Sequence, residues 1–143
     1  MSFIGNREKN FEKFLKNHFD IVLPREVSLF YAKGIRVGNH ELANCGIHGD
    51  LGYAACDFGF NPTNALVQNF GHLARKNVLE LDEPAAKAFA AGMPIKRDLG
   101  TKNKQLIIRF GKHIVGLGYY DKDQKKVVNK IPEKRRRNIV NEI

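Results

Sequence analysis

The chain has 143 residues, of which 43% are hydrophobic, and it carries a formal net charge of +9 at pH 7. This length suits one domain or two small ones, and no apolar run approaches the roughly 20 residues of a membrane-spanning helix, so we expect no membrane role. The N-terminal sequence MSFIGNREKN lacks the basic and then apolar layout of a secretory signal. We therefore expect a cytoplasmic protein whose two cysteines are thiols.

The positive charge is concentrated in the second half of the sequence. Residues 1–80 contain nine Lys and Arg against eight Asp and Glu, whereas residues 81–143 contain fifteen against seven. A basic region of this kind is typical of proteins that bind nucleic acid, because neutralised phosphates release counterions and drive binding. The alternative is a solvated basic surface that only adds solubility.

The first half of the chain combines helix and strand patterns. Apolar side chains at helical spacing predict an amphipathic helix over residues 6–19. Residues 27–31 and 35–37 are predicted strands, and the short turn between them makes a hairpin. We assign residues 1–76 to an N-terminal α+β domain.

A second helix is predicted within the same domain. Asn61 is a favourable N-cap and Pro62 suits a first helical turn, so the helix is expected to start there and to run to about Lys76. Its predicted buried face consists of Ala65, Leu66, Phe70, Leu73 and Ala74.

The remaining residues, 77–143, are predicted to form a second domain rich in strands. After a strand at 78–81, Asp82 is expected to cap a short alanine-rich helix that Gly92 ends. Three further strands are predicted at 106–110, 113–120 and 126–128, the first two joined by a tight turn. The expected fold class is α+β, with an N-terminal α/β segment followed by a small β-pseudobarrel that contains one short helix.

The order of these elements and several short motifs resemble a known protein family. Residues 93–95 (MPI) and 98–100 (DLG), between the alanine-rich helix and the hairpin, are similar to a PUA domain, an RNA-binding pseudobarrel. Residues 115–119 (VGLGY) and 128–135 (VNKIPEKR) resemble the PUA-like C-terminal domain of Fmu/Sun-type rRNA 5-methylcytosine methyltransferases. Together with upstream segments that begin at Gly34, the resemblance extends to Arg137.

This resemblance implies a non-catalytic RNA-binding protein that binds structured rRNA in ribosome biogenesis or rRNA modification. It would act in trans with an rRNA-modifying enzyme or an assembling ribosomal subunit. We do not expect an enzyme, because a methyltransferase needs a βαβ unit with a glycine-rich turn for its cofactor and none fits the remaining sequence. The alternative is a protein-interaction adaptor with a solvated basic tail. The oligomeric state stays open.

The expected RNA-binding residues lie in the second domain. Gly116 and Gly118 fall on one strand face, where the absence of side chains would let a ribose-phosphate backbone approach closely. Tyr119 is placed to stack on a base, and arginines suit phosphate contacts. The full set is Lys96, Arg97, Lys102, Lys104, Gly116, Gly118, Tyr119, Lys130, Lys134, Arg135, Arg136 and Arg137.

A zinc site is the main rival interpretation of the cysteines. His40, Cys45, His48 and Cys56 lie close together in the sequence, but they lack the paired C-x-x-C spacing of a structural zinc site. We therefore expect no metal and no cofactor, with Cys56 as a small buried apolar residue. Whether the four residues bind a metal is left open by the sequence.

Overall fold

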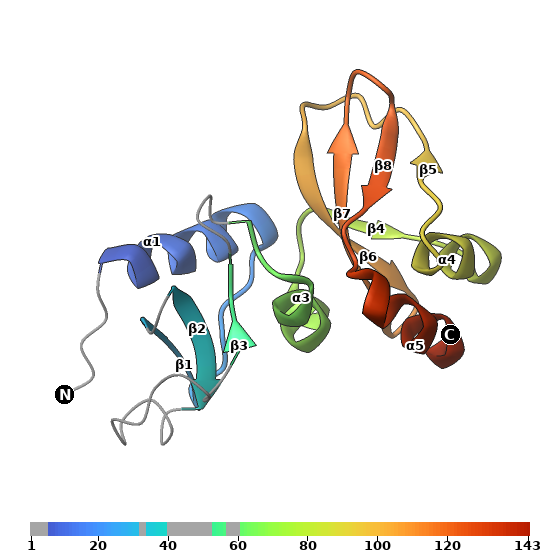
Figure 1. Ribbon diagram of the computed structural model, residues 1–143. Coiled ribbons are helices and arrows are strands. Elements are labelled where there is room, and N and C mark those ends of the chain that lie inside the picture. Colours follow the sequence, from blue (N-terminus) through green and yellow to red (C-terminus); the bar gives the residue numbers. More distant parts are fainter. Residues whose placement is uncertain (1–5, 32–33, 40–52, 57–60) are drawn as a thin grey trace. The chain divides into compact units, whose positions relative to one another are not determined.

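The computed structural model describes residues 6–31, 34–39, 53–56 and 61–143 (Figure 1). The chain divides into two compact units, Met1–Lys76 (unit 1) and Asn77–Ile143 (unit 2), and each contains both helices and strands. The fold class is mixed α+β, as the sequence predicts. Among the described residues, no helix is long and apolar enough to cross a membrane.

Unit 1 combines an N-terminal helix with a small antiparallel sheet. Helix α1 (Asn6–Phe14) continues as the π-helical turn η1 (Leu15–Phe19), which confirms the predicted helix. The sheet has the order β1 (Val27–Tyr31), β2 (Ile35–Asn39), β3 (Tyr53–Ala54). Strands β1 and β2 pair as the predicted hairpin. The helical apolar stripe is core, because Phe11, Leu15 and Phe19 are all at most 1% exposed.

Helix α3 (Asn64–Phe70) begins later than the sequence predicts. Its N-cap is Thr63, whose hydroxyl accepts a hydrogen bond from Leu66 N at 3.2 Å. Pro62 lies before the helix and forms an isolated bridge of the β type. The prediction that Asn61 caps this helix is therefore wrong, since the threonine two residues on takes that role.

The end and the buried face of this helix also differ from the prediction. The α-helix gives way to a 3-10 turn, η2 (Gly71–Leu73), so the helical segment stops short of Lys76. Ala65 is exposed, whereas Asn64 and Val67 are buried beside Leu66.

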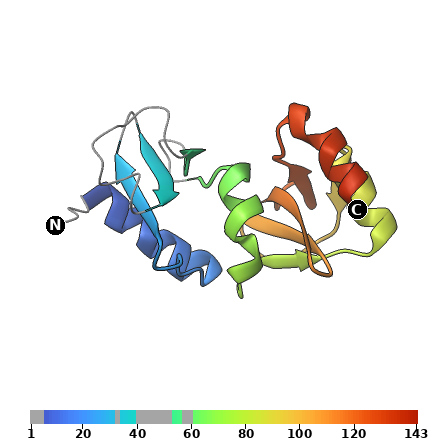
Figure 2. The ribbon, with the colours of Figure 1, turned by 90° about the horizontal axis from the view of Figure 1, so that it is seen from below.

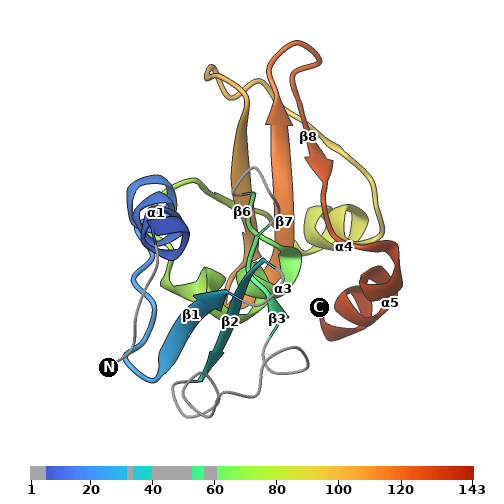
Figure 3. The same cartoon turned by 60° about the vertical axis from the view of Figure 1, so that its left-hand side comes forward.

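Unit 2 is built on a curled five-stranded sheet of order β4-β6-β7-β8-β5. The strands are β4 (Val78–Glu80), β5 (Ile95–Lys96), β6 (Lys104–Phe110), β7 (His113–Asp121) and β8 (Lys126–Asn129). Strand β4 runs parallel to β6, and the other pairs are antiparallel. The turn between β7 and β8 lies at the end of the sheet away from the helices of this unit (Figure 3). The predicted strands of this unit are confirmed.

Helix α4 (Glu83–Ala90) forms as its end signals predict. The Asp82 carboxylate accepts a hydrogen bond from Ala85 N at 2.9 Å, which caps the helix start. At the other end Gly92 has a φ of +114°, and the N–H groups of Gly92 and Met93 bond back to helix carbonyls at 2.9 and 3.0 Å. These two bonds are a Schellman motif, which requires the glycine.

A second helix, α5 (Glu133–Glu142), is formed by the arginine-rich segment. The one predicted helix of this domain is therefore joined by a second, formed by a segment whose conformation the sequence leaves open. Helices α4 and α5 lie side by side (Figure 2), and Phe89 and Ile139, at 1% and 4% exposure, belong to the same core cluster. The apolar residues at positions 139, 140 and 143 recur at helical spacing, so burial of this face stabilises the helix despite its charge.

Candidate nucleic-acid interface

The two faces of the β5–β8–β7 part of the sheet have opposite character. Ile95 pairs with Val127 and belongs to the core, and the next pair along the same strands is Lys96 with Lys126. Because successive side chains point to opposite faces, the two lysines lie on the face away from the core. We call this the outer face, and its residues at this end of the sheet are Lys96, Gln105, Tyr119, Asp121, Lys126 and Val128.

The outer face holds two lysines directly opposite each other. Like charges in this position destabilise a strand pair unless something neutralises them. Within the described part of the chain, no carboxylate lies within ion-pair distance of Lys96 or Lys126. Asp121 faces Lys126 in the register, but its Oδ1 accepts backbone N–H groups of the following turn at 3.0 and 3.2 Å. Neither lysine is therefore held in an ion pair, although Asp121 adds one negative charge to the same face.

Tyr119 lies on the same face with a cation beside it. The ammonium group of Lys130 is 5.9 Å from the centre of the Tyr119 ring. The ring is half-buried, whereas Tyr120, the next residue, is 1% exposed and belongs to the core. Because successive residues of a strand point to opposite faces, only the first of these two tyrosines is accessible. Further along the outer face Leu117 is buried, so the accessible part is the end that carries Tyr119.

Helix α5 separates the basic residues of the C-terminal segment into two groups. Lys134, Arg135 and Arg137 are exposed on its solvent side. Arg136 is half-buried, its Nε donates to Ile131 O at 3.2 Å, and its guanidinium packs against Gly92. Arg136 therefore has a packing role, and the structure does not group it with the exposed phosphate-binding candidates.

The remaining predicted cations lie near the turn end of the sheet. Arg97 and Lys102 are exposed on the loop between β5 and β6. Lys104 pairs with Tyr120 in the register, so it lies on the core side of the sheet and not on the outer face. The structure thus separates Lys104, on the core side of β6, from the exposed loop residues Arg97 and Lys102.

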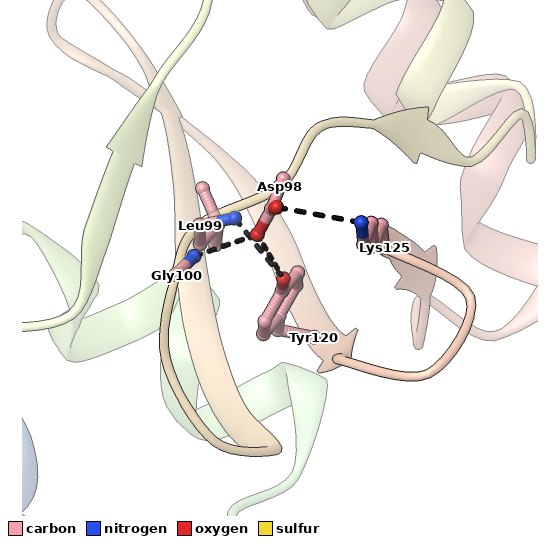
Figure 4. A network of polar contacts seen from close by, with 5 residues as sticks. All are labelled: Asp98, Leu99, Gly100, Tyr120 and Lys125. Atoms are coloured by element: carbon pink, nitrogen blue, oxygen red, sulfur yellow. Dashed lines mark hydrogen bonds and ion pairs between the residues drawn. The ribbon is translucent and has the colours of Figure 1, made fainter.

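A polar network fixes the loop that follows β5. The Asp98 carboxylate accepts hydrogen bonds from Gly100 N at 2.9 Å and from the Tyr120 hydroxyl at 3.3 Å, and Lys125 Nζ is 3.8 Å from its other oxygen (Figure 4). The same hydroxyl accepts from Leu99 N at 3.0 Å. The Gly100 bond lowers the pKa of Asp98 below 3.8, and Tyr120 and Lys125 act in the same direction against partial desolvation. The core tyrosine thus holds the loop that carries Arg97 and Lys102.

The glycines of β7 do not open a face for an RNA backbone. Gly116 and Gly118 are both buried. A Cβ on Gly118 would lie 2.9 Å from Val127 Cγ1 and 3.2 Å from two atoms of Ile108. The expectation that ribose-phosphate approaches these glycines is wrong, because core side chains of the neighbouring strands already fill the space.

Of the four residues in the rival zinc interpretation, three, namely His40, Cys45 and His48, lie outside the described residues. Cys56 is half-buried, and it forms an isolated antiparallel β-bridge with Pro62. The described residues contain no group of three or more His, Cys, Asp or Glu that could hold a metal ion.

Sequence reasoning missed Lys126, the residue that completes the outer-face pair. A signal for it exists in the sequence KVVN, where the residues beside the apolar Val127 must point away from the core. The register that places Lys126 opposite Lys96 joins residues thirty positions apart, and no local pattern carries it. The exposed Lys112, Lys122 and Lys125 were missed as well.

No protein-family model matches this chain, and a search of the curated proteins finds no match. The interface is therefore defined by its own chemistry. Unit 2 contains fifteen Lys and Arg against eight Asp and Glu. Its described ion pairs engage three of these cations, Lys87, Arg109 and Lys125. The remaining charge needs counterions, and a polyanion would release them.

Proposed function

We propose that this chain is a non-catalytic RNA-binding protein whose unit 2 is a PUA-like domain that binds structured rRNA. It would act in trans with an rRNA-modifying enzyme or an assembling ribosomal subunit. The observation that carries the proposal is the outer face, where Lys96 and Lys126 stand opposite each other beside an accessible tyrosine. Neither lysine is in an ion pair among the described residues, so a phosphate would offset their repulsion and an apolar partner would not.

The PUA-like part of the proposal is supported by the sequence motifs together with a coarse feature of the fold. The motifs around residues 93–100 and 115–135 resemble that family. Unit 2 has a curled sheet in which α4 follows the first strand and the β6–β7 hairpin follows the DLG segment. This order agrees with the order on which the resemblance rests.

Binding across a salt series tests the function. The full chain would be titrated with rRNA fragments and with duplex DNA of equal phosphate content, as wild type and as Lys96→Ala/Lys126→Ala/Lys130→Ala. We expect RNA to bind more tightly than DNA. The triple variant should bind RNA more weakly, and its log–log salt slope should fall by about 0.7–0.9 for each phosphate that the missing lysines no longer neutralise.

A matched variant controls for the reduced net charge. Lys9, Lys13 and Arg25 are exposed residues of unit 1, and changing all three to alanine removes the same charge. This variant should bind RNA nearly as wild type does. If both variants lose equal affinity, or if RNA and DNA bind equally, the proposal fails. A partner captured with little dependence on salt would instead support the protein-interaction adaptor.

A further inference from the structure

The accessible aromatic surface of unit 2 is small and sits among cations. Phe89 and Tyr120 are each 1% exposed, whereas Phe110 and Tyr119 are half-buried, and Phe110 packs against the core cluster. Tyr119 is the tyrosine of this unit that keeps an accessible part of its ring. Lys130 lies beside that ring. Val128 is the cross-strand neighbour of Tyr119, and Lys126 lies two residues before Val128. An aromatic face between cations is a surface on which nucleic-acid bases stack while phosphates are neutralised.

The contact between Lys130 and Tyr119 is one that a ligand can replace. At 5.9 Å from the ring centre, the ammonium is near the outer limit of about 6 Å for a cation–π interaction. The lysine is exposed and its side chain is flexible, so it can move from the ring to a phosphate at little cost. A base could then occupy the ring face.

The spacing of the lysines fits an extended strand of nucleic acid. Lys126 begins β8 and Lys130 follows its last residue, Asn129, so the two lysines lie at opposite ends of this strand, which spans roughly 10 Å. Tyr119 lies between these positions, because it pairs with Val128. A few extended nucleotides could place phosphates at both ends of this row and a base at its centre.

A paired helix does not fit this arrangement. Bases within a duplex are stacked on both sides, so none can offer its face to Tyr119 without being pulled out of the stack. Lysines contact phosphate as point charges and do not supply the planar fork with which arginine reads base edges. The site is thus suited to unpaired nucleotides with little preference among bases.

We infer that the outer face of unit 2 binds single-stranded RNA, with an unstacked base on Tyr119 and phosphates on Lys96, Lys126 and Lys130. This inference deepens the proposed function and rests on it. Within structured rRNA, the corresponding targets are loops, bulges and strand ends. The paired stems would be bound only through charge.

The test uses fluorescence anisotropy of the full chain with a labelled 12-nucleotide oligo(U) and a blunt RNA duplex of equal phosphate content. Wild type should favour oligo(U). Tyr119→Ala should weaken oligo(U) binding about 5- to 100-fold, because stacking contributes about that factor per base, and should leave the duplex affinity unchanged. Tyr119→Phe should bind as wild type. Lys96→Ala/Lys126→Ala should reduce the salt slope, which Tyr119→Ala should not change.

Tyr119→Leu controls for packing, since it keeps apolar bulk and lacks a flat ring. Circular dichroism shows whether this variant is folded, and the folded variant should lose oligo(U) affinity as Tyr119→Ala does. The inference is overturned if the duplex binds as tightly as oligo(U), or if the folded Ala and Leu variants bind oligo(U) as wild type does. If RNA still binds with a steep salt slope in that case, the proposed function stands without this site. If neither RNA binds, the proposed function itself fails.

Discussion

The guanidinium of Arg136 lies across Gly92, so that a Cβ on residue 92 would stand 2.9 Å from Arg136 Nη1. Because Gly92 ends α4 and Arg136 belongs to α5, this contact joins the two helices. The cation also sits near the partly negative C-terminus of α4, which is the favourable end for a positive charge. One member of an arginine run is therefore used inside the fold, and its neighbours face solvent.

Gly92→Ala should lower the free energy of unfolding by about 1–3 kcal/mol, because the φ of +114° is strained for any residue with a Cβ. The steric overlap with Arg136 should add little, since the guanidinium is the movable end of a flexible side chain. Urea unfolding of Gly92→Ala in the wild-type and Arg136→Ala backgrounds separates the two causes. Equal losses of stability are expected; a loss that disappears without Arg136 would show that the clash dominates.

Asn129 connects α4 to the segment that leads into α5. Its Nδ2 donates to Phe89 O, and its Oδ1 accepts from Ile131 N at 2.6 Å. Ile131 is 2% exposed, so Asn129→Ala leaves a buried N–H without this partner and should cost about 1–3 kcal/mol of unfolding free energy. Chemical denaturation measures the difference.

Asn129→Asp should make the stability deficit at this position depend on pH. The aspartate keeps the acceptor for Ile131 but sets a carboxylate oxygen against Phe89 O in place of a donor. Protonation restores an O–H donor, so the stability deficit of Asn129→Asp relative to wild type should shrink as the pH is lowered. A deficit that is constant with pH would mean that the bond to Phe89 contributes little.

Gly118→Ala should destabilise unit 2 by about 1–3 kcal/mol through overpacking, because its Cβ would meet Val127 and Ile108 at 2.9 and 3.2 Å. Val127→Ala removes the atom nearest to the new Cβ. The double mutant Gly118→Ala/Val127→Ala should therefore lose less unfolding free energy than the sum of the losses of the two single mutants. Thermal or urea unfolding gives the coupling. Since Gly118 lies on the core side, RNA affinity per folded molecule should not change, and a selective loss of affinity would contradict its placement.

Local signals in the sequence predict most elements of this fold, and the failures have physical causes. Asp82 marks the start of α4 and Gly92 marks its end, and the helix forms between them as predicted. For α3 the predicted cap was wrong, because the side chain of Thr63 and not that of Asn61 accepts the hydrogen bond of the first turn. In α5 the apolar spacing was present, but the run of charge obscured it.

The candidate site was harder to predict than the elements that carry it. The alternation of apolar and charged residues in β8 shows that Lys126 points away from the core. Its position opposite Lys96 depends on a register between distant strands, and so does the filling of the space at Gly118. Long-range pairing therefore decides which basic residues share a face, and composition shows only that they are many.

The hydroxyl of Tyr120, whose ring is buried in the core, connects Leu99 to Asp98. Tyr120→Phe removes the acceptor of Leu99 N and the donor to Asp98, and should cost about 1 kcal/mol of unfolding free energy. The same change should raise the pKa of Asp98 toward 3.8, although not fully, because the Gly100 bond remains its largest cause of lowering. Since the folded-state pKa is lowered, the stability linked to Asp98 is present above the unfolded pKa and is lost as the pH falls through the folded value. An NMR titration of the Asp98 carboxyl in wild type and Tyr120→Phe measures this, and an unchanged midpoint would show that the hydroxyl does not interact with the carboxylate in solution.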